Sequence, residues 1–505
     1  MKIAVCSLTL LCISLLCLFS ADATVKPFDV RRHLSTVTRY DVSRDTSNVA
    51  SFSSAIPDGC EAIHLNLVAR HGTRSPTKKR IKELDRLAVR LAALVEEANH
   101  EGSSEASKIP SWIRGWESPW KGRMKGGELT DLGEQELYRL SLRVSDRFPE
   151  IFSRDYHPDL YPIKATQVPR AAASAVAFGI GLFSGKGTLG SGQHRAFSVV
   201  SESRASDNQL RFHDNCATYK SYRESREPEV EKLKEPIIEE ITSALISRHH
   251  LNFKRQDVAS LWFLCKQQAS LLDITDQACG LFSETEILLL EWTDDLEFFL
   301  LKGYGKSINY WMGVPLLRNI FQTMQEAIRA NEESLPGGMY ERAQLRFAHA
   351  ETIVPFSCLL GLFLEGDEYK KIQRSESLDL PPKPPQKRNW RGSSIAPFAG
   401  NNMLVLYQCR SKQTDQNISY HVQVLHNEVP VSLPACGTDF CPFEIFKERV
   451  VDPLLKHEFD NICSVKNAVG DVVEVPKPCS WSCKFLNFLS GFFSSSQPQQ
   501  EKSEL

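Results

Sequence analysis

Apolar runs alternate with amphipathic stretches along the first part of the chain, a pattern typical of α/β proteins. Residues 62–69 form a mostly apolar run that predicts a buried strand. Residues 77–99 place apolar positions at helical spacing, and Thr130 can cap the helix that follows it. The pattern further predicts helices over 131–147 and 171–183 and a strand over 196–200.

The middle of the chain has a different pattern. Residues 219–321 contain long helical repeats, such as 237–246 and 284–301, and almost no strand signal. Strand patterns return at 344–348, 402–406 and 419–425. We therefore predict an α/β body formed by residues 55–218 and 322–480, with an inserted, mostly helical subdomain at 219–321.

The N-terminal residues have the form of a secretory signal peptide. Lys2 precedes an apolar run over 3–19, and Ala21-Asp22-Ala23 has the A-x-A form that signal peptidase cuts, which predicts a signal peptide at 1–23. The alternative is a retained membrane anchor, for which the run is short. Residues 24–54 are polar and predict an irregular leader.

The C-terminal residues 481–505 are rich in Ser and Gln and predict a flexible tail. Their apolar stretch is too short to span a bilayer, so we expect no stable membrane anchor there. The last four residues, Lys502-Ser503-Glu504-Leu505, differ from the K-D-E-L retrieval signal only at Ser503. Residency in the endoplasmic reticulum and a chance polar tail both stay open, as do secretion and a vacuolar location.

Composition narrows the possible partners. A chain of 505 residues is longer than a single hydrophobic core usually supports, so two structural units are expected. The formal net charge of −2 provides no global basic field, so charge does not support a nucleic-acid or membrane-surface partner. An anionic substrate would have to be held by locally clustered cations. The oligomeric state stays open.

Cysteine usage fits an oxidising compartment. Of 14 cysteines, Cys6, Cys12 and Cys17 lie in the signal segment, and the odd number that remains leaves at least one thiol unpaired. We expect this thiol to be Cys358, which lies in an apolar run. Asn417 begins the one N-x-S/T sequon and is a candidate glycosylation site.

Candidate chemistry is concentrated directly after the first strand, in Arg70-His71-Gly72-Thr73-Arg74-Ser75-Pro76. Arginine forks bind phosphate oxygens in pairs, and the start of the next helix adds oriented N–H groups. The flanking positive charges should depress the pKa of His71, which keeps the imidazole neutral and able to attack. Taken alone, such a histidine is more often structural, so the interpretation depends on the whole motif.

The motif is the R-H-G-x-R-x-P signature of the histidine acid phosphatases, and five fixed positions recur by chance in about one chain in ten thousand. Arg170 resembles the third phosphate-binding arginine of that family. Segments 207–216, 303–305 and 390–409 resemble further family blocks, so the likeness covers roughly 55–465. It implies the histidine phosphatase fold, a central mixed sheet flanked by helices.

One departure from the usual pattern narrows the subfamily. Most histidine acid phosphatases have His-Asp at the distal site, whereas this chain has His349-Ala350-Glu351, which resembles the multiple inositol polyphosphate phosphatases, including plant-type phytases. The likeness implies that His349 helps hold the phosphoryl group and that Glu351 protonates the leaving oxygen. The missing Asp leaves the proton donor open, and Glu351 as an exposed carboxylate at a helix start is the alternative.

The resemblance implies a phosphohistidine mechanism with no cofactor and no metal. The phosphoryl group would lie among Arg70, Arg74, Arg170 and His349, and His71 would attack it. The substrate would be an inositol polyphosphate such as phytate, whose other phosphates need further cations. The candidates for these contacts are Lys78, Lys79 and Arg80, with Lys186 or His194 from the loop 184–195. Lys78 and Lys79 as the solvated face of a helix is the alternative.

Disulfides follow only from the resemblance. It suggests the pairs Cys60–Cys409, Cys265–Cys279 and Cys436–Cys441, and it pairs Cys216 with Cys479 or Cys483.

Three other functions remain open at this point. One is a broad acid phosphatase that acts on sugar, nucleotide or aryl phosphates. A second is a phosphomutase or bisphosphoglycerate phosphatase, of which a glycolytic mutase is disfavoured by the signal peptide. The third is a non-catalytic receptor for anionic ligands, which would be expected to lose His71 or the distal carboxylate.

Overall fold

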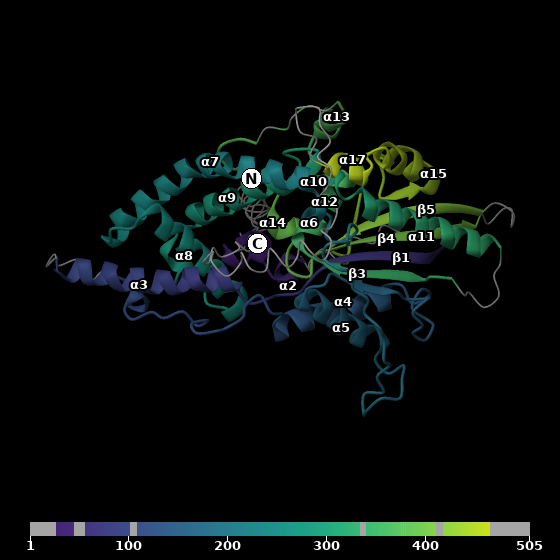
Figure 1. Cartoon of the computed structure of the whole chain (residues 1–505), viewed down its shortest axis with the longest axis horizontal. Coiled ribbons are helices and arrows are strands. Elements are labelled where there is room, and N and C mark those ends of the chain that lie inside the picture. Colours follow the sequence, from purple (N-terminus) through teal and green to yellow (C-terminus); the bar gives the residue numbers. More distant parts are fainter. Residues whose placement is uncertain are drawn as a thin grey trace, which may run out of the picture.

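The computed structural model describes residues 27–44, 56–100, 109–333, 340–410 apart from 375, 377 and 379, and 418–464. The predicted signal peptide, Asn417 and the tail at 481–505 lie outside these residues. Seven strands form one sheet in the order β2-β3-β1-β4-β5-β6, with β7 paired to β5 (Figure 1). None of the helices among the described residues is both long and apolar enough to cross a bilayer.

The four long strands match the predicted runs. They are β1 (Cys60–Arg70), β3 (Ala343–Ala348), β4 (Asn401–Arg410) and β5 (Ile418–His426), and the short ones are β2 (Ile163–Ala165), β6 (Val429–Val431) and β7 (Phe440–Pro442). β1 pairs in parallel with β3 and antiparallel with β4, so the predicted mixed sheet is confirmed. β1 is buried from Ala62 to its end, because it is central and covered on both faces.

Helices cover both faces of the sheet (Figure 1). On one face lie α4 (Asp131–Arg147) and α5 (Pro169–Phe183), whose apolar side chains share a core with Leu65 and Leu67 of β1. On the other face lie α11 (Val314–Glu332) and α12 (Ala350–Leu359), which pack with Val68. Thr130 caps α4 as predicted, because its hydroxyl accepts a hydrogen bond from the Gly133 N–H.

A third hydrophobic core is formed by helices that lie beside the end of the sheet (Figure 1). It contains apolar residues of α7 (Ala217–His249), α8 (Arg255–Gln267) and α9 (Glu284–Lys302). The long helix α3 (Lys78–His100) leaves the sheet and joins this core through Leu84, Leu87 and Leu91. The helices α7 and α8 therefore pack mainly on one another, on α9 and on α3, whereas α10 (Ile308–Trp311) and α11 pack in the core beside the sheet.

The structure contains the disulfides Cys60–Cys409, Cys265–Cys279 and Cys436–Cys441, and Cys358 is a buried free thiol. The pairing of Cys216 with Cys479 or Cys483 is wrong. Cys216 bonds Cys463, because α17 (Phe459–Cys463) packs on the start of α7 and brings the two Cα atoms to 4.4 Å. Four disulfides fit a secreted protein or one of the secretory pathway.

The strand predicted over 196–200 is wrong. Only Val200 pairs, in a single bridge with Lys164 of β2. The aromatic ring of Phe197 instead packs against Phe183 at the end of α5, so the apolar character of this segment serves a side-chain contact.

The leader folds onto the body where irregular chain was predicted. Its described part forms the 3-10 turns η1 (Val30–His33) and η2 (Ser35–Val37) and the short helix α2 (Tyr40–Ser43). Leu34 and Tyr40 are almost fully buried.

Two buried carboxylates of α9 attach the leader to the body. Glu291 accepts a hydrogen bond from His33 at 3.0 Å and ion-pairs with Arg391 at 2.8 Å and Arg388 at 3.2 Å. One turn further on, Asp295 also pairs with Arg388 and accepts the backbone N–H of Gly392 at 2.8 Å. Burial and the charge of Glu291 raise the pKa of Asp295 to about 7.

The loop that follows β1 is packed against α4 at backbone distance. A Cβ on Gly72 would lie 2.2 Å from the Gly133 carbonyl oxygen, and a Cβ on Gly133 would lie 2.2 Å from the Thr73 carbonyl oxygen. Only glycine fits at either position. Glu136 of α4 accepts the Thr73 N–H at 2.7 Å and the Tyr40 N–H at 3.1 Å, so α4 holds the loop and the leader together.

We predict that Glu291→Gln lowers the free energy of unfolding by about 3 kcal/mol, because it leaves buried cationic partners without their counter-ion. Urea unfolding would measure the loss. Glu240→Gln is the matched control, because Glu240 pairs with Lys383 at 3.0 Å where both side chains are more than half exposed. It should cost less than about 1 kcal/mol, and equal losses in the two variants would contradict the bracing role of Glu291.

Candidate active site

Strand pairing brings the two sequence motifs together. In the register of β1 and β3, Arg70 lies opposite Ala348, so the residues that follow each strand emerge at the same edge of the sheet. The His71 N–H donates to the Ala348 carbonyl at 3.0 Å. The rings of His71 and His349 lie 5.4 Å apart, centroid to centroid.

His71 is held as a neutral imidazole. Its Nδ1 lies 2.9 Å from the Gly72 carbonyl oxygen, which can only accept, so Nδ1 carries the proton and Nε2 carries the lone pair. Burial, followed by the charges of Arg170 and Arg70, lowers the pKa of His71 well below its usual value. The sequence-based expectation for this pKa had the right direction, and the structure adds burial as the largest cause.

Arg70 is fixed by segments that the motif does not contain. Its Nη1 donates to the backbone carbonyls of Thr36, in the leader, and Ala396, the latter at 2.7 Å. Its Cζ lies 4.5 Å above the ring of Phe398. Burial lowers the pKa of Arg70 to about 10, which still leaves it charged at neutral pH. Its buried Nε has no hydrogen-bond partner among the described residues.

Two guanidinium groups approach the two histidines from other elements, and a third comes from the loop that contains His71. Arg170, at the start of α5, places Nη2 3.3 Å from Nδ1 of His349. Arg211 places Nη1 2.9 Å from Nε2 of His349 and is anchored by an ion pair with Asp214. Arg74, from the loop after β1, adds to the positive field at His71. Sequence reasoning included Arg211 only in a family block and assigned it no role at the site.

Glu351 is buried and ionised. It lies in the first turn of α12 with 7% exposure, so the exposed-carboxylate alternative is wrong. Its Oε1 accepts from Nζ of Lys302 at 3.0 Å. Burial alone would raise the pKa of Glu351, but the positive charges of Lys302, His213 and His349 outweigh it and hold the pKa well below the usual range. Lys302 had no signal in the sequence, because it ends α9, far from the motif.

Of the three cations predicted in residues 78–80, only Arg80 lines the cavity. Arg80 lines the cavity that contains Arg70 and stacks 4.8 Å over the ring of Phe263. Lys78 and Lys79 are exposed at the start of α3 and are not among the described residues that line this cavity.

The loop 184–195 is not brought to the site. Lys186 donates to the Phe152 carbonyl at 3.0 Å, and His194 pairs with Leu189 within the loop. This loop follows the C-terminal end of α5, whereas Arg170 lies at the other end of the helix. A helix of this length spans about 20 Å, so a ligand beside Arg170 is out of reach of Lys186.

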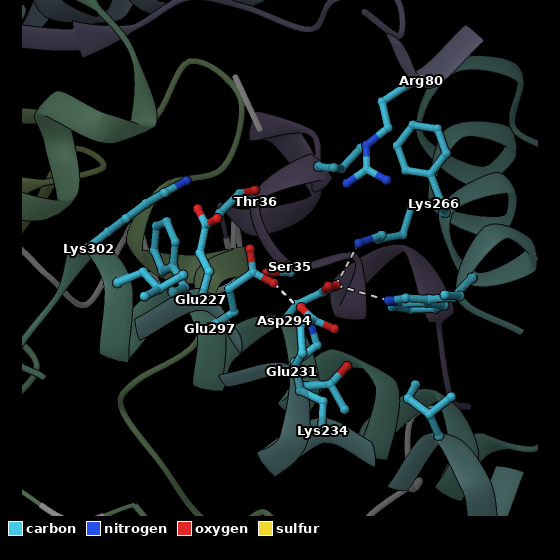
Figure 2. Close-up of a pocket in the computed structure, with 18 of the residues that line it drawn as sticks. Ser35, Thr36, Arg80, Glu227, Glu231, Lys234, Lys266, Asp294, Glu297 and Lys302 are labelled. Carbon is cyan, nitrogen blue, oxygen red and sulfur yellow. Dashed lines mark hydrogen bonds and ion pairs between the residues drawn. The ribbon is translucent and has the colours of Figure 1, made fainter. Parts of the chain in front are cut away.

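A cavity of about 610 Å³ extends from Arg70 and Arg74 toward the middle-segment helices. Figure 2 shows its wall, with Lys302, Thr36 and Arg80 around an interior rich in charged groups. Its volume is that of a small-molecule site. Among the described residues, no group of three or more His, Cys, Asp or Glu side chains is arranged to hold a metal ion.

Comparisons of the sequence agree with this geometry. A profile of the Histidine phosphatase superfamily (branch 2) matches residues 62–427. Multiple inositol polyphosphate phosphatase 1 of Gallus gallus is 25% identical over 431 residues, which cover 84% of this chain and 88% of the relative. The protein of the same name from Dictyostelium discoideum is 26% identical over 464 residues, which cover 82% of this chain and 70% of the relative.

Solved structures share the fold. The phytase from D. castellii matches with a TM-score of 0.64 at 16% identity, covering 89% of this chain and 92% of that one. The multiple inositol polyphosphate phosphatase of Bifidobacterium longum in complex with inositol hexasulfate matches with a TM-score of 0.56 at 20% identity, covering 84% and 98%. The family profile matches well over half of the residues of this chain. The chain therefore belongs to the histidine phosphatase superfamily, branch 2.

Proposed function

We propose that this protein is a phosphatase that hydrolyses inositol polyphosphates such as phytate through a phosphohistidine on His71. The observation that carries the proposal is a neutral imidazole, with its Nε2 lone pair available, buried among arginine side chains. The names of the sequence relatives support the substrate class. The cavity is large enough for a phosphorylated ring and has basic groups well beyond the scissile site.

In the first step, Nε2 of His71 forms a bond to phosphorus while the bond from phosphorus to the inositol oxygen breaks. Arg70, Arg74, Arg170 and His349 neutralise the charge that spreads over the phosphoryl oxygens. Arg211 orients His349 through the contact at 2.9 Å. No step requires a cofactor or a metal ion.

Glu351 must gain a proton before it can act as the acid. In the unliganded site its pKa is held down by Lys302 and neighbouring histidines. A bound polyanion offsets those positive charges, so the pKa of Glu351 rises toward the working range. The acid then gives its proton to the leaving oxygen, which departs as an inositol hydroxyl.

In the second step, the Glu351 carboxylate takes a proton from water as the water oxygen bonds to phosphorus. The bond between nitrogen and phosphorus breaks, which releases inorganic phosphate and restores His71. Arg80 is placed to hold a further phosphate, whereas Lys78 and Lys79 are exposed and do not line the cavity.

The test of the mechanism is to trap the intermediate. Rapid quench with labelled phytate should give an acid-labile, base-stable phosphoryl adduct on His71. His71→Ala should retain less than about 1% of the activity, whereas His157→Ala, at an exposed position, should keep it. Substantial activity without His71 would overturn the mechanism. Equal kcat/KM values for phytate and simple aryl or sugar phosphates would instead identify a broad acid phosphatase.

A second test concerns the proton donor. An inositol alkoxide is a poor leaving group and nitrophenolate a good one, so Glu351→Gln should slow phosphoenzyme formation from phytate by about a hundredfold. The nitrophenol burst from the aryl phosphate should stay near its normal rate, and Glu351→Asp should recover part of the phytate rate. Equal loss on both substrates would show that the proton comes from another group.

We also propose that the tail Lys502–Leu505 keeps the protein in the endoplasmic reticulum, with secretion or a vacuolar location as the alternative. Deleting these four residues should then move the protein from the cell fraction to the culture medium. If the distribution is the same with and without them, the tail is not a retrieval signal.

A further inference from the structure

The cavity that would receive a polyanion is partly lined by acidic side chains. Among the described residues that line it, nine are basic and six are acidic. A site adapted only for tight binding of a ligand with many phosphates would not need these six acidic residues, because each carboxylate repels the ligand. Their placement therefore bears on which phosphorylated ligands bind well.

Two of these carboxylates are held deep in the wall by lysines. Asp294 and Glu297 lie one turn apart on α9, and Figure 2 shows both facing the cavity. Asp294 accepts from Nζ of Lys266 at 2.6 Å and from the Trp262 indole N–H at 2.9 Å. Glu297 accepts from Nζ of Lys234 at 2.8 Å.

These inner pairs differ from the pairs at the rim. The side chains of Lys266 and Lys234 are only 11% and 15% exposed, so solvent screens their ion pairs weakly. Glu235 and Arg255, which also line the cavity, are paired at 2.5 Å but are both more than half exposed. A pair of that kind contributes little. The charge of Lys234 is further secured because its pKa is raised above the usual value by Glu297 and Glu231, against the effect of burial.

A ligand phosphate can use these lysines fully only by displacing the carboxylates that they already hold. These are Asp294 on Lys266, and Glu297 and Glu231 on Lys234. A ligand with one phosphate, seated beside His71, avoids this cost, because it binds without contacting Lys266 or Lys234.

We propose that Asp294 and Glu297 are specificity-determining residues that hold Lys266 and Lys234 as counter-ions and so weaken the binding of densely phosphorylated ligands relative to monophosphates. The inference rests on the proposed substrate class. It assigns these two carboxylates a part in selecting among inositol phosphates by the number of their charges.

The experiment uses the full-length protein and a non-hydrolysable polyanion. Inhibition of aryl phosphate hydrolysis by inositol hexasulfate gives a Ki for wild type, Asp294→Asn and Glu297→Gln. The ratio of this Ki to the KM for the aryl phosphate should fall by about three- to tenfold in Asp294→Asn, which frees Lys266, and by a smaller factor in Glu297→Gln, because Glu231 still pairs with Lys234 at 2.7 Å. Glu240→Gln is the control, because Glu240 lies on α7 outside the cavity lining and should leave the ratio unchanged.

A double variant distinguishes carboxylates that compete with the ligand for a lysine from ion pairs that only brace the helices. Adding Lys266→Gln to Asp294→Asn should abolish the gain, because the lysine that the ligand would use is gone. A gain that persists without Lys266, or a ratio that is unchanged or higher in both single variants, would overturn the proposal and leave the pairs as braces between helices. If Asp294→Asn does not fold, Glu297→Gln with Lys234→Gln provides the same comparison.

The test of this inference does not depend on phytate hydrolysis. The hexasulfate Ki is measurable whether or not the protein hydrolyses phytate. A lower ratio without phytate hydrolysis would remove only the proposed function, and phytate hydrolysis with an unchanged ratio would remove only this inference.

Discussion

The parallel pairing of β1 with β3 sets Arg70 opposite Ala348, and two segments far apart in the sequence end at one edge of the sheet. Everything at the site depends on this register. A shift by one residue would turn the side chains of either strand to the opposite face. The parallel arrangement also points the amino ends of α5 and α12 toward the same place, which brings Arg170 and Glu351 to the two histidines.

Gathering so many cations in a buried site creates an electrostatic cost that the rest of the structure offsets. The Arg70 guanidinium is satisfied by backbone carbonyls of Thr36 and Ala396, which hold it without neutralising it. The leader is therefore part of the site. It is attached through Glu291 and Asp295, whose own charges are compensated by Arg388 and Arg391. The result is a net positive field at His71 in a fixed geometry.

The positive charges of the site also affect the protonation states of His71 and Glu351. They help keep His71 neutral, as a nucleophile requires, and they keep Glu351 ionised while the site is empty. Burial is the largest cause at His71, where the charges of Arg170 and Arg70 act in the same direction, whereas at Glu351 the charges of Lys302, His213 and His349 outweigh burial. In the mechanism that we propose, binding and acid catalysis are coupled, because the charge of a bound polyanion offsets the positive charges that hold the pKa of Glu351 low.

The sequence by itself determined the local features. The central strand, the cap at Thr130 and the loop around His71 follow from patterns within a few residues, where geometry is fixed by the backbone. The motif also predicted the direction of the His71 pKa, because its arginines are sequence neighbours.

Only the tertiary structure decided the long-range contacts. Lys302 reaches Glu351 from the end of a helix in the middle segment, and Arg211 reaches His349 from a loop, with no periodicity or spacing to reveal either. The same holds for Cys216, whose partner depends on where α17 packs, and for Lys186, which the length of α5 carries away from the site. A sequence records which charges exist. Their distances, burial and counter-ions, which set what each charge can do, come from the packing of elements on one another.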